Sequence, residues 1–274
     1  MIKTFAGFSL DRPLIMGIVN ATPDSFSDGG EAFDFEDAVA RGLQMMQDGA
    51  DIIDVGGEST RPGAAPVSIE EEVRRTVPVI KRLSDAGACV SIDTRHALVM
   101  EEALAAGAEI INDVTALTGD ARSLDVAASC QAPVILMHMQ GEPGTMQANP
   151  TYEDAAKEVL DYLTARLQAC EAAGINRDRL ALDPGIGFGK TVAHNVEILK
   201  RLDDYQDLGL ALLLGVSRKS FIGALANEPE AQRRLPGSIA AALWGLAHGV
   251  DILRVHDVGE TVQALKVWQG IENA

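Results

Sequence analysis

The chain has 274 residues, of which 47% are hydrophobic, and it carries a formal net charge of −17 at pH 7. The length exceeds that of an ordinary domain but is normal for an α/β barrel, and the hydrophobic content allows a large core. The acidic balance argues against nucleic acid and anionic membranes as partners, whereas small anions can still bind where basic side chains cluster.

No segment resembles a secretion signal or a membrane span. Asp11 and Arg12 interrupt the first apolar residues, and no apolar run approaches the length needed to cross a bilayer. The three cysteines, Cys89, Cys130 and Cys170, are isolated and form no CxxC pair. Such cysteines are typical of a reducing compartment, so we expect a cytoplasmic protein with no membrane partner.

Short apolar runs alternate with amphipathic runs along the whole chain. After a small hairpin or plug at residues 3–10, we expect eight buried strands at 14–19, 51–55, 89–92, 109–111, 133–137, 180–182, 210–216 and 251–255. Helices are predicted over 35–48, 68–85, a segment ending at 106, 152–173, 193–202, 237–248 and 258–270. The strands are apolar along their length, as in a parallel sheet that is covered on both faces.

Eight strand–helix units match the count of a (β/α)8 TIM barrel. We therefore predict an α/β fold with one barrel domain over residues 1–274 and a short N-terminal hairpin. The structural alternative is a doubly wound open sheet, which usually has fewer strands and a single switch-point fingerprint.

The run from Leu180 to Lys190 reads LALDPGIGFGK and combines a short strand with a glycine loop. Asp183 ends the strand, where burial of its carboxylate is costly without a partner. The run fits neither the Walker pattern nor the dinucleotide pattern, because Pro184 and Lys190 stand where glycines are required. Taken alone it is more typical of a structural turn, but the same layout of strand and polar loop recurs along the chain.

Nearly every predicted strand ends at a polar side chain, and in a barrel these ends carry function. They are Asn20, Thr60 with Arg61, Asp93, Asn112, His138, Asp183, Lys219, and Arg254 with His256. Each has an ordinary structural explanation: an Asp after a strand can cap the next helix, an Asn can shape a turn, and a His can belong to the core. A polar residue after nearly every strand is more than helix capping requires.

The chemistry of these residues divides into acceptors and donors. Asp93, Asn112 and Asp183 are acceptors suited to a ligand edge rich in N–H groups, such as the amino-pyrimidine edge of a pterin. The donors Lys219, Arg254 and His256 follow the last two strands, the usual phosphate corner of such barrels, and Arg61 adds a further cation. Asn20 offers a neutral oxygen to a Mg²⁺ ion that water and phosphates otherwise hold.

These motifs resemble the dihydropteroate synthase family over essentially the whole chain. Residues 18–30 read IVNATPDSFSDGG and resemble its first signature, and residues 54–63 read DVGGESTRPG and resemble its second. Further matches follow in order at residues 91–94, 111–113, 183–190, 215–220 and 254–256.

The resemblance implies condensation of 6-hydroxymethyl-7,8-dihydropterin diphosphate with 4-aminobenzoate, with Mg²⁺ as cofactor and a homodimer as the assembly. It implies catalytic roles for Lys219, Arg254, His256, Asp93 and Arg61. The implied pterin diphosphate site comprises Thr60, Asp93, Asn112, Met137, Asp183, Phe188, Lys219, Arg254 and His256. The implied 4-aminobenzoate site comprises Phe26, Thr60, Pro62, Phe188, Lys219 and Ser220, and Asn20 is the implied metal ligand.

A neutral aniline needs no strong base, so we expect the difficult step to be the loss of pyrophosphate by a largely dissociative path. Two alternatives stay open. A corrinoid-linked methyltransferase with a pterin-binding barrel would share the heterocycle site but would not need the basic phosphate corner. A non-catalytic pterin-binding homologue would bind the pterin without releasing pyrophosphate.

Overall fold

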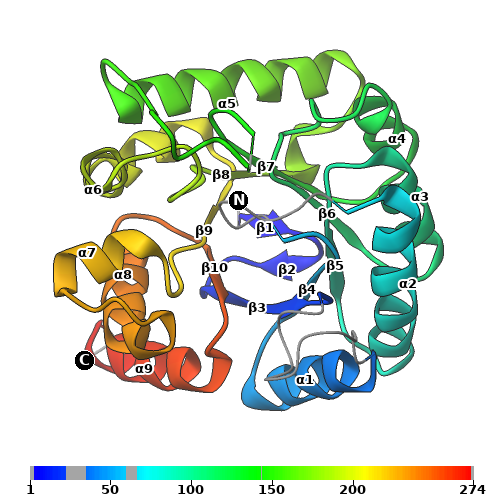
Figure 1. The fold of residues 1–274 in the computed structure, drawn as a ribbon, viewed down its shortest axis with the longest axis horizontal. Helices are drawn as coiled ribbons and strands as arrows, with labels where there is room; N and C mark the ends of the chain where they lie inside the picture. Colours follow the sequence, from blue (N-terminus) through cyan, green and yellow to red (C-terminus); the bar gives the residue numbers. More distant parts are fainter. Residues whose placement is uncertain (1–2, 23–34, 60–66, 143, 273–274) are drawn as a thin grey trace.

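The structure, a computed structural model, describes residues 3–22, 35–59, 67–142 and 144–272. Within these residues, eight parallel strands close into a barrel in the order β10-β3-β4-β5-β6-β7-β8-β9 (Figure 1). They are β3 (Leu14–Asn20), β4 (Ile52–Gly56), β5 (Val90–Asp93), β6 (Ile110–Asp113), β7 (Val134–Met137), β8 (Leu180–Asp183), β9 (Ala211–Leu214) and β10 (Ile252–Val255). The predicted barrel is confirmed, and a doubly wound sheet is excluded because β10 pairs with β3.

Helices surround the barrel on its outside (Figure 1). In chain order they are α1 (Phe35–Asp48), α2 (Ile69–Asp85), α3 (Ala97–Ala105), α4 (Ser123–Ser129), α5 (Ala155–Ala172), α6 (Val192–Lys200), α7 (Ser220–Ala226), α8 (Leu235–Ala247) and α9 (Val258–Glu272). Short 3₁₀ turns lie at η2 (Arg177–Arg179), η3 (Leu202–Leu208) and η4 (Ala231–Arg234). None of the helices described combines the length and apolar character needed to cross a bilayer.

The sequence analysis did not predict α4 and α7. Each has seven residues, which is too short for the repeating apolar pattern that identifies a helix.

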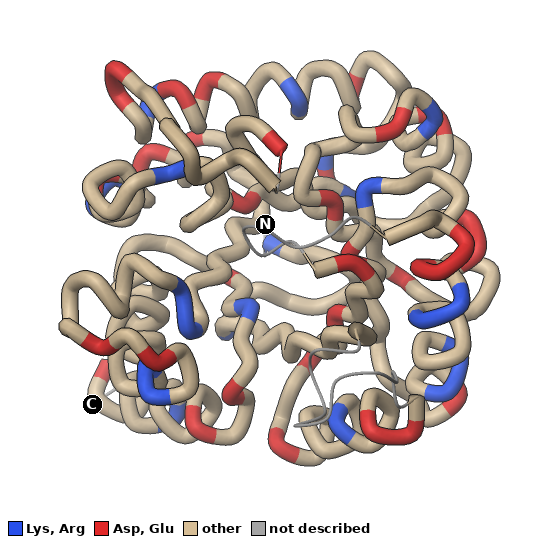
Figure 2. The backbone as a smooth tube through the Cα atoms, in the orientation of Figure 1, with Lys and Arg blue, Asp and Glu red and all other residues tan. Residues whose placement is uncertain are grey.

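Acidic residues lie along most of the outer helices, with Lys and Arg among them (Figure 2). The charge of the protein is therefore spread over its outer surface.

A predicted hairpin closes the amino-terminal end of the barrel. Strands β1 (Thr4–Phe5) and β2 (Phe8–Ser9) pair antiparallel. Phe5 is 1% exposed and packs with the apolar side chains that fill the barrel interior, among them Leu14, Ile52, Ile110 and Ile252. The hairpin thus seals one end of the barrel with a hydrophobic plug.

Side-chain alternation makes the barrel interior change from apolar to polar along the strands. The inward residues Ile52, Ile110, Ala181 and Ile252 belong to the apolar cluster. Because side chains two residues apart on a strand share one face, the next inward residues on these strands are Asp54, Asn112, Asp183 and Arg254. Asp93 joins the same level, since it is paired in register with Asn112. The carboxyl-terminal end of the barrel is therefore a buried polar layer.

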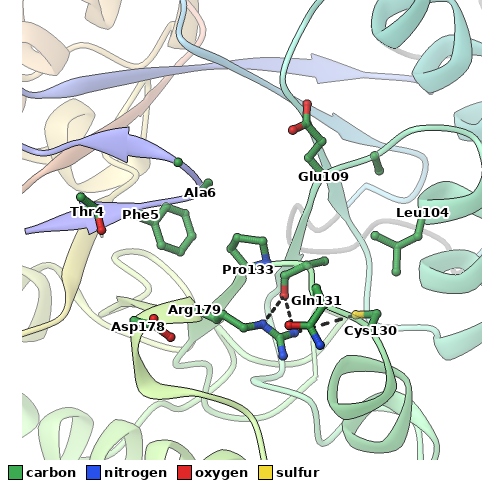
Figure 3. A pocket seen from close by; sticks show the side chains of 13 residues that line it. Thr4, Phe5, Ala6, Leu104, Glu109, Cys130, Gln131, Pro133, Asp178 and Arg179 are labelled. Carbon is green, nitrogen blue, oxygen red and sulfur yellow. Dashed lines mark hydrogen bonds between the residues drawn. The ribbon is translucent and has the colours of Figure 1, made fainter.

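A cavity of about 600 Å³ lies at the opposite, amino-terminal end, between the hairpin and the residues that precede β7 and β8 (Figure 3). Its basic side chain, Arg179, donates to the carbonyl oxygens of Ala127 at 3.0 Å and Ala132 at 2.6 Å. The first bond satisfies a carbonyl in the last turn of α4 and the second a carbonyl just before β7, so Arg179 has a structural function there.

Candidate active site

A buried guanidinium joins two carboxylates at the mouth of the barrel. The Nε of Arg254 donates to Oδ2 of Asp54 at 2.6 Å, and its Nη2 donates to Oδ2 of Asp93 at 2.6 Å. These residues come from β10, β4 and β5; β10 and β4 flank β3, and β5 follows β4 around the barrel. The two carboxylates hold the cation in one orientation above the apolar core and raise the pKa of Arg254.

Asp54 is the site residue that the sequence analysis missed. It is fully buried, and its Oδ2 also accepts a hydrogen bond from Nδ2 of Asn112 at 3.1 Å. Because Asn112 donates its amide group to Asp54, its carbonyl oxygen is the part that can accept from a ligand. The signal in the sequence was a charged residue in the middle of the apolar strand IIDVG. Only a bonded partner makes such burial tolerable.

Asp93 and Asp183 keep acceptor oxygens at the barrel mouth. Burial raises the pKa of the Asp93 carboxyl, whereas the charge of Arg254 lowers it. Burial also raises the pKa of Asp183, opposed by the charge of Lys219 and by the Gly185 amide, which donates to Oδ1 at 2.7 Å. One oxygen of each carboxylate, Oδ1 of Asp93 and Oδ2 of Asp183, has no hydrogen bond within the described residues and can accept from a ligand.

Lys219 reaches the same mouth from the turn after β9. Its Nζ donates to the carbonyl oxygen of Ile186 and lies 4.7 Å from the centre of the Phe188 ring. Burial lowers the pKa of Lys219 to about 8. A side chain at Gly215 would lie 3.8 Å from Nζ of Lys219 and 3.9 Å from Cβ of Arg254.

Backbone strain beside Lys219 fixes the direction of this turn. Arg218 has a φ of 60°, a left-handed conformation that is rare for residues with a side chain. Three contacts hold it there: its amide donates to Oγ of Ser238 at 2.8 Å, its carbonyl accepts from Arg234 at 3.0 Å, and its guanidinium pairs with Asp257. Such strain persists where the surrounding structure over-determines it, which is typical of functional sites.

His256 lies at the end of β10, next to this basic corner. Its Nδ1 lies 3.0 Å from Oγ of Ser217, and burial lowers its pKa to about 3, assisted by the charges of Arg218 and Arg254. Burial and the neighbouring arginines therefore favour the neutral form of His256. A neutral imidazole can still donate one N–H bond to an anion.

Some of the other predicted site residues lie within the described part of the structure, and others lie outside it. Met137 is buried at the end of β7, Phe188 is half-buried in the glycine loop, and Ser220 is exposed at the start of α7. Asn20 ends β3, where it pairs in register with Gly56. Phe26, Thr60, Arg61 and Pro62 lie outside the described residues. His138, also a polar strand end, bonds to Lys190 within the protein.

The described residues offer a Mg²⁺ ion one candidate protein ligand, the amide oxygen of Asn20. No group of three or more His, Cys, Asp or Glu side chains in the described ranges is arranged to hold a metal. The amide oxygen of Asn20 is suited to be one protein ligand of an ion that keeps its water and phosphate ligands. The donor chemistry is thus compatible with a diphosphate-bound ion.

Known proteins match the chain over nearly its full length. The pterin binding enzyme family matches residues 16–256. The dihydropteroate synthase of Neisseria meningitidis serogroup B is 50% identical over 267 residues, which cover 96% of this chain and 94% of the relative.

Solved structures of Xanthomonas albilineans dihydropteroate synthase are similar in fold and sequence. The complex with 4-aminobenzoic acid aligns with a TM-score of 0.92 and 49% identity, covering 97% of this chain and 96% of that chain. The complex with 7,8-dihydropteroate aligns with a TM-score of 0.89 and 46% identity, with the same coverage. Together with the barrel and its polar mouth, these matches establish that the chain belongs to the pterin binding enzymes and, among them, to the dihydropteroate synthases.

Proposed function

We propose that the chain joins 6-hydroxymethyl-7,8-dihydropterin diphosphate to 4-aminobenzoate at the barrel mouth, by a largely dissociative loss of pyrophosphate. The observation that carries this proposal is the meeting of buried acceptors with cations at one end of the barrel. Acceptors lie on β5, β6 and β8, and the cations Lys219 and Arg254 stand beside them. This pairing suits a ligand with an N–H-rich ring and an anionic tail.

The acceptors Asp93, Asn112 and Asp183 bind the N–H groups of the pterin in this proposal. The side-chain carbonyl of Asn112 is oriented toward the ligand because Asp54 accepts a hydrogen bond from the Nδ2–H of Asn112. Lys219 and Arg254 favour the charged form of Asp183. A carboxylate that accepts from two neighbouring N–H groups also favours positive charge on the ring, which develops as the C–O bond breaks. Met137 borders the ring as an apolar wall.

The leaving pyrophosphate is stabilised by the basic corner. Arg254 contributes a permanent cation, and His256 contributes an N–H donor. Arg61 is proposed as a further cation, and Asn20 as a protein ligand of Mg²⁺. When bound, the metal ion supplies Lewis-acid stabilisation of the negative charge on the diphosphate oxygens.

The nucleophile pocket lies on the side of Lys219 and Phe188. The ring of Phe188 packs near the Lys219 ammonium and can contact the ring of 4-aminobenzoate. Lys219 and Ser220 offer donors to its carboxylate, and Phe26, Thr60 and Pro62 are proposed to complete the pocket. Exclusion of water matters here, because water would otherwise capture the pterin cation. The unpaired cysteines agree with a reaction in the reducing cytoplasm.

The first prediction concerns the overall reaction. With Mg²⁺ present, pyrophosphate should be released at a sustained rate when both substrates are supplied, and dihydropteroate should accumulate in equal amount. The measurement is a coupled pyrophosphate assay, with product quantified by chromatography. Pterin binding without pyrophosphate release would favour a non-catalytic homologue. Methyl transfer from a methylated pterin to a corrinoid would favour the methyltransferase.

The second prediction concerns pH. The pKa of Lys219 is lowered to about 8, so its ammonium is present below that pH and is lost as the pH rises through it. If the cation binds substrate, kcat/KM should fall on the alkaline side with a midpoint near this value. Lys219→Arg should be slower, but it should lack this alkaline limb because Arg stays charged. An identical alkaline limb in the variant would contradict the assignment to Lys219.

We also propose a homodimer formed through helices α6, α7 and α8. A surface groove between α6 and α7 is lined by Val192, Val196 and Leu225, and its lining is mostly apolar. Leu225 is 65% exposed, and Trp244 of α8, also exposed, donates its Nε1–H to the carbonyl of Leu199 in α6. Exposed apolar patches of this kind mark interaction surfaces. We propose that a second copy of the chain binds to this groove.

The third prediction tests this surface. Leu225→Glu places a charge in the groove and should shift the protein from dimer to monomer in sedimentation velocity, because a buried unpaired charge opposes association. The control is Val267→Glu, since Val267 is similarly exposed but lies on α9. Wild-type protein that sediments as a monomer would contradict the proposal.

A further inference from the structure

The glycine loop after β8 encloses a buried ammonium group that the proposed mechanism does not use. Lys190 is 3% exposed, and its Nζ donates to the carbonyl oxygens of Gly185 at 2.9 Å and Phe188 at 3.0 Å. It also lies 3.3 Å from the carbonyl oxygen and 2.9 Å from Nδ1 of His138. These four acceptors oppose the cost of burying the charge, and burial still lowers the pKa of Lys190 well below its usual value.

The glycines of the loop make this arrangement possible. Gly185, Gly187 and Gly189 have φ values of 66°, 87° and 60°, a conformation that suits glycine. A Cβ atom on Gly185 would lie 1.9 Å from the carbonyl oxygen of His138, and one on Gly189 would lie 2.3 Å from that of Gln140. The loop therefore packs directly on the backbone after β7, and Lys190 joins the two segments where their carbonyls converge.

The same loop carries groups of the nucleophile pocket. Gly185 and Phe188 turn their carbonyls to Lys190, whereas Ile186, between them, turns its carbonyl to Lys219. A Cβ atom on Gly187 would lie 3.2 Å from Cδ of Lys219. Any rotation of the loop backbone would therefore displace both the acceptor of Lys219 and the ring of Phe188.

We propose that Lys190 is a positioning residue for the nucleophile: by tying the glycine loop to the end of β7, it holds the Ile186 carbonyl and the Phe188 ring against Lys219. This inference rests on the proposed function, in which Lys219 and Phe188 border the 4-aminobenzoate pocket. Of the proposed pterin acceptors, Asp183 accepts from the Gly185 amide of this loop. Asp93 and Asn112 lie on β5 and β6 and have no hydrogen bond to the loop among the described residues. Loss of Lys190 should therefore affect 4-aminobenzoate more than the pterin.

The test compares Lys190→Met with wild type and with Lys266→Met, which removes an exposed lysine from α9. In Lys190→Met, the KM for 4-aminobenzoate should rise by about tenfold or more, since small misplacements of binding groups have large effects. The KM for the pterin diphosphate should change by less than about threefold. Lys266→Met should match wild type in both constants.

Hydrogen exchange followed by mass spectrometry gives a readout that does not depend on turnover. Peptides spanning residues 138–141 and 184–190 should exchange faster in Lys190→Met, while peptides from β3, β4 and β10 should be unchanged. Lys190→Gln, which keeps two N–H donors, should lie between wild type and Lys190→Met, and it serves as the variant if Lys190→Met does not fold.

Two results would overturn the inference. One is faster exchange in the two segments without a change in the KM for 4-aminobenzoate, which would give Lys190 a structural function alone. The other is unchanged exchange, or an equal rise throughout the barrel. A third result would contradict only the proposed function: wild-type protein that exchanges slowly in both segments but forms no dihydropteroate. In that case Lys190 would still link the two segments.

Discussion

The ion pair between Arg254 and the carboxylates of Asp54 and Asp93 is the interaction on which the barrel mouth depends. A guanidinium inside a barrel is tolerated because Asp54 and Asp93 each accept from it at 2.6 Å. Removing one member of such a buried pair leaves an uncompensated charge and typically costs about 3–5 kcal/mol. Asp54 also accepts from Asn112, so one carboxylate orients both the guanidinium of Arg254 and the side-chain amide of Asn112.

Two lysines extend this arrangement to the nucleophile side. Lys219 donates to the carbonyl of Ile186, and Lys190 donates to those of Gly185 and Phe188 in the same glycine loop. The positive charge of each lysine favours the ionised form of Asp183. Burial favours the neutral form of Lys190, Lys219 and Asp183, since it lowers the pKa of the two lysines and raises that of the aspartate. Carboxylates and cations thus stabilise one another across the site, whereas Lys219 lowers the pKa of Lys190 and Arg254 lowers that of Lys219.

The barrel was predictable from sequence because its signal is repetitive: apolar runs that end in polar residues recur eight times, and the observed strands differ from the predicted ones by a few residues at their ends. The acceptors at the strand ends were predictable for the same reason. Asp54 was missed because it lies inside its strand, two residues before the end, whereas the sequence analysis considered only polar residues at or after the strand ends. The function of Lys190 was equally hidden, since its partners are backbone carbonyls that carry no sequence signal.

The central claim is that the buried acceptors of the barrel mouth bind the pterin, and calorimetric titration of Asp183→Asn with a pterin ligand tests it most directly. The substitution places the side-chain amide N–H of Asn against an N–H donor of the ligand, and a buried mismatch of this kind costs about 1–3 kcal/mol. The affinity should therefore fall by about tenfold, whereas Asp207→Asn, an exposed control on η3, should bind like wild type. Equal pterin affinity in Asp183→Asn and wild type would remove Asp183 from the site and contradict the account.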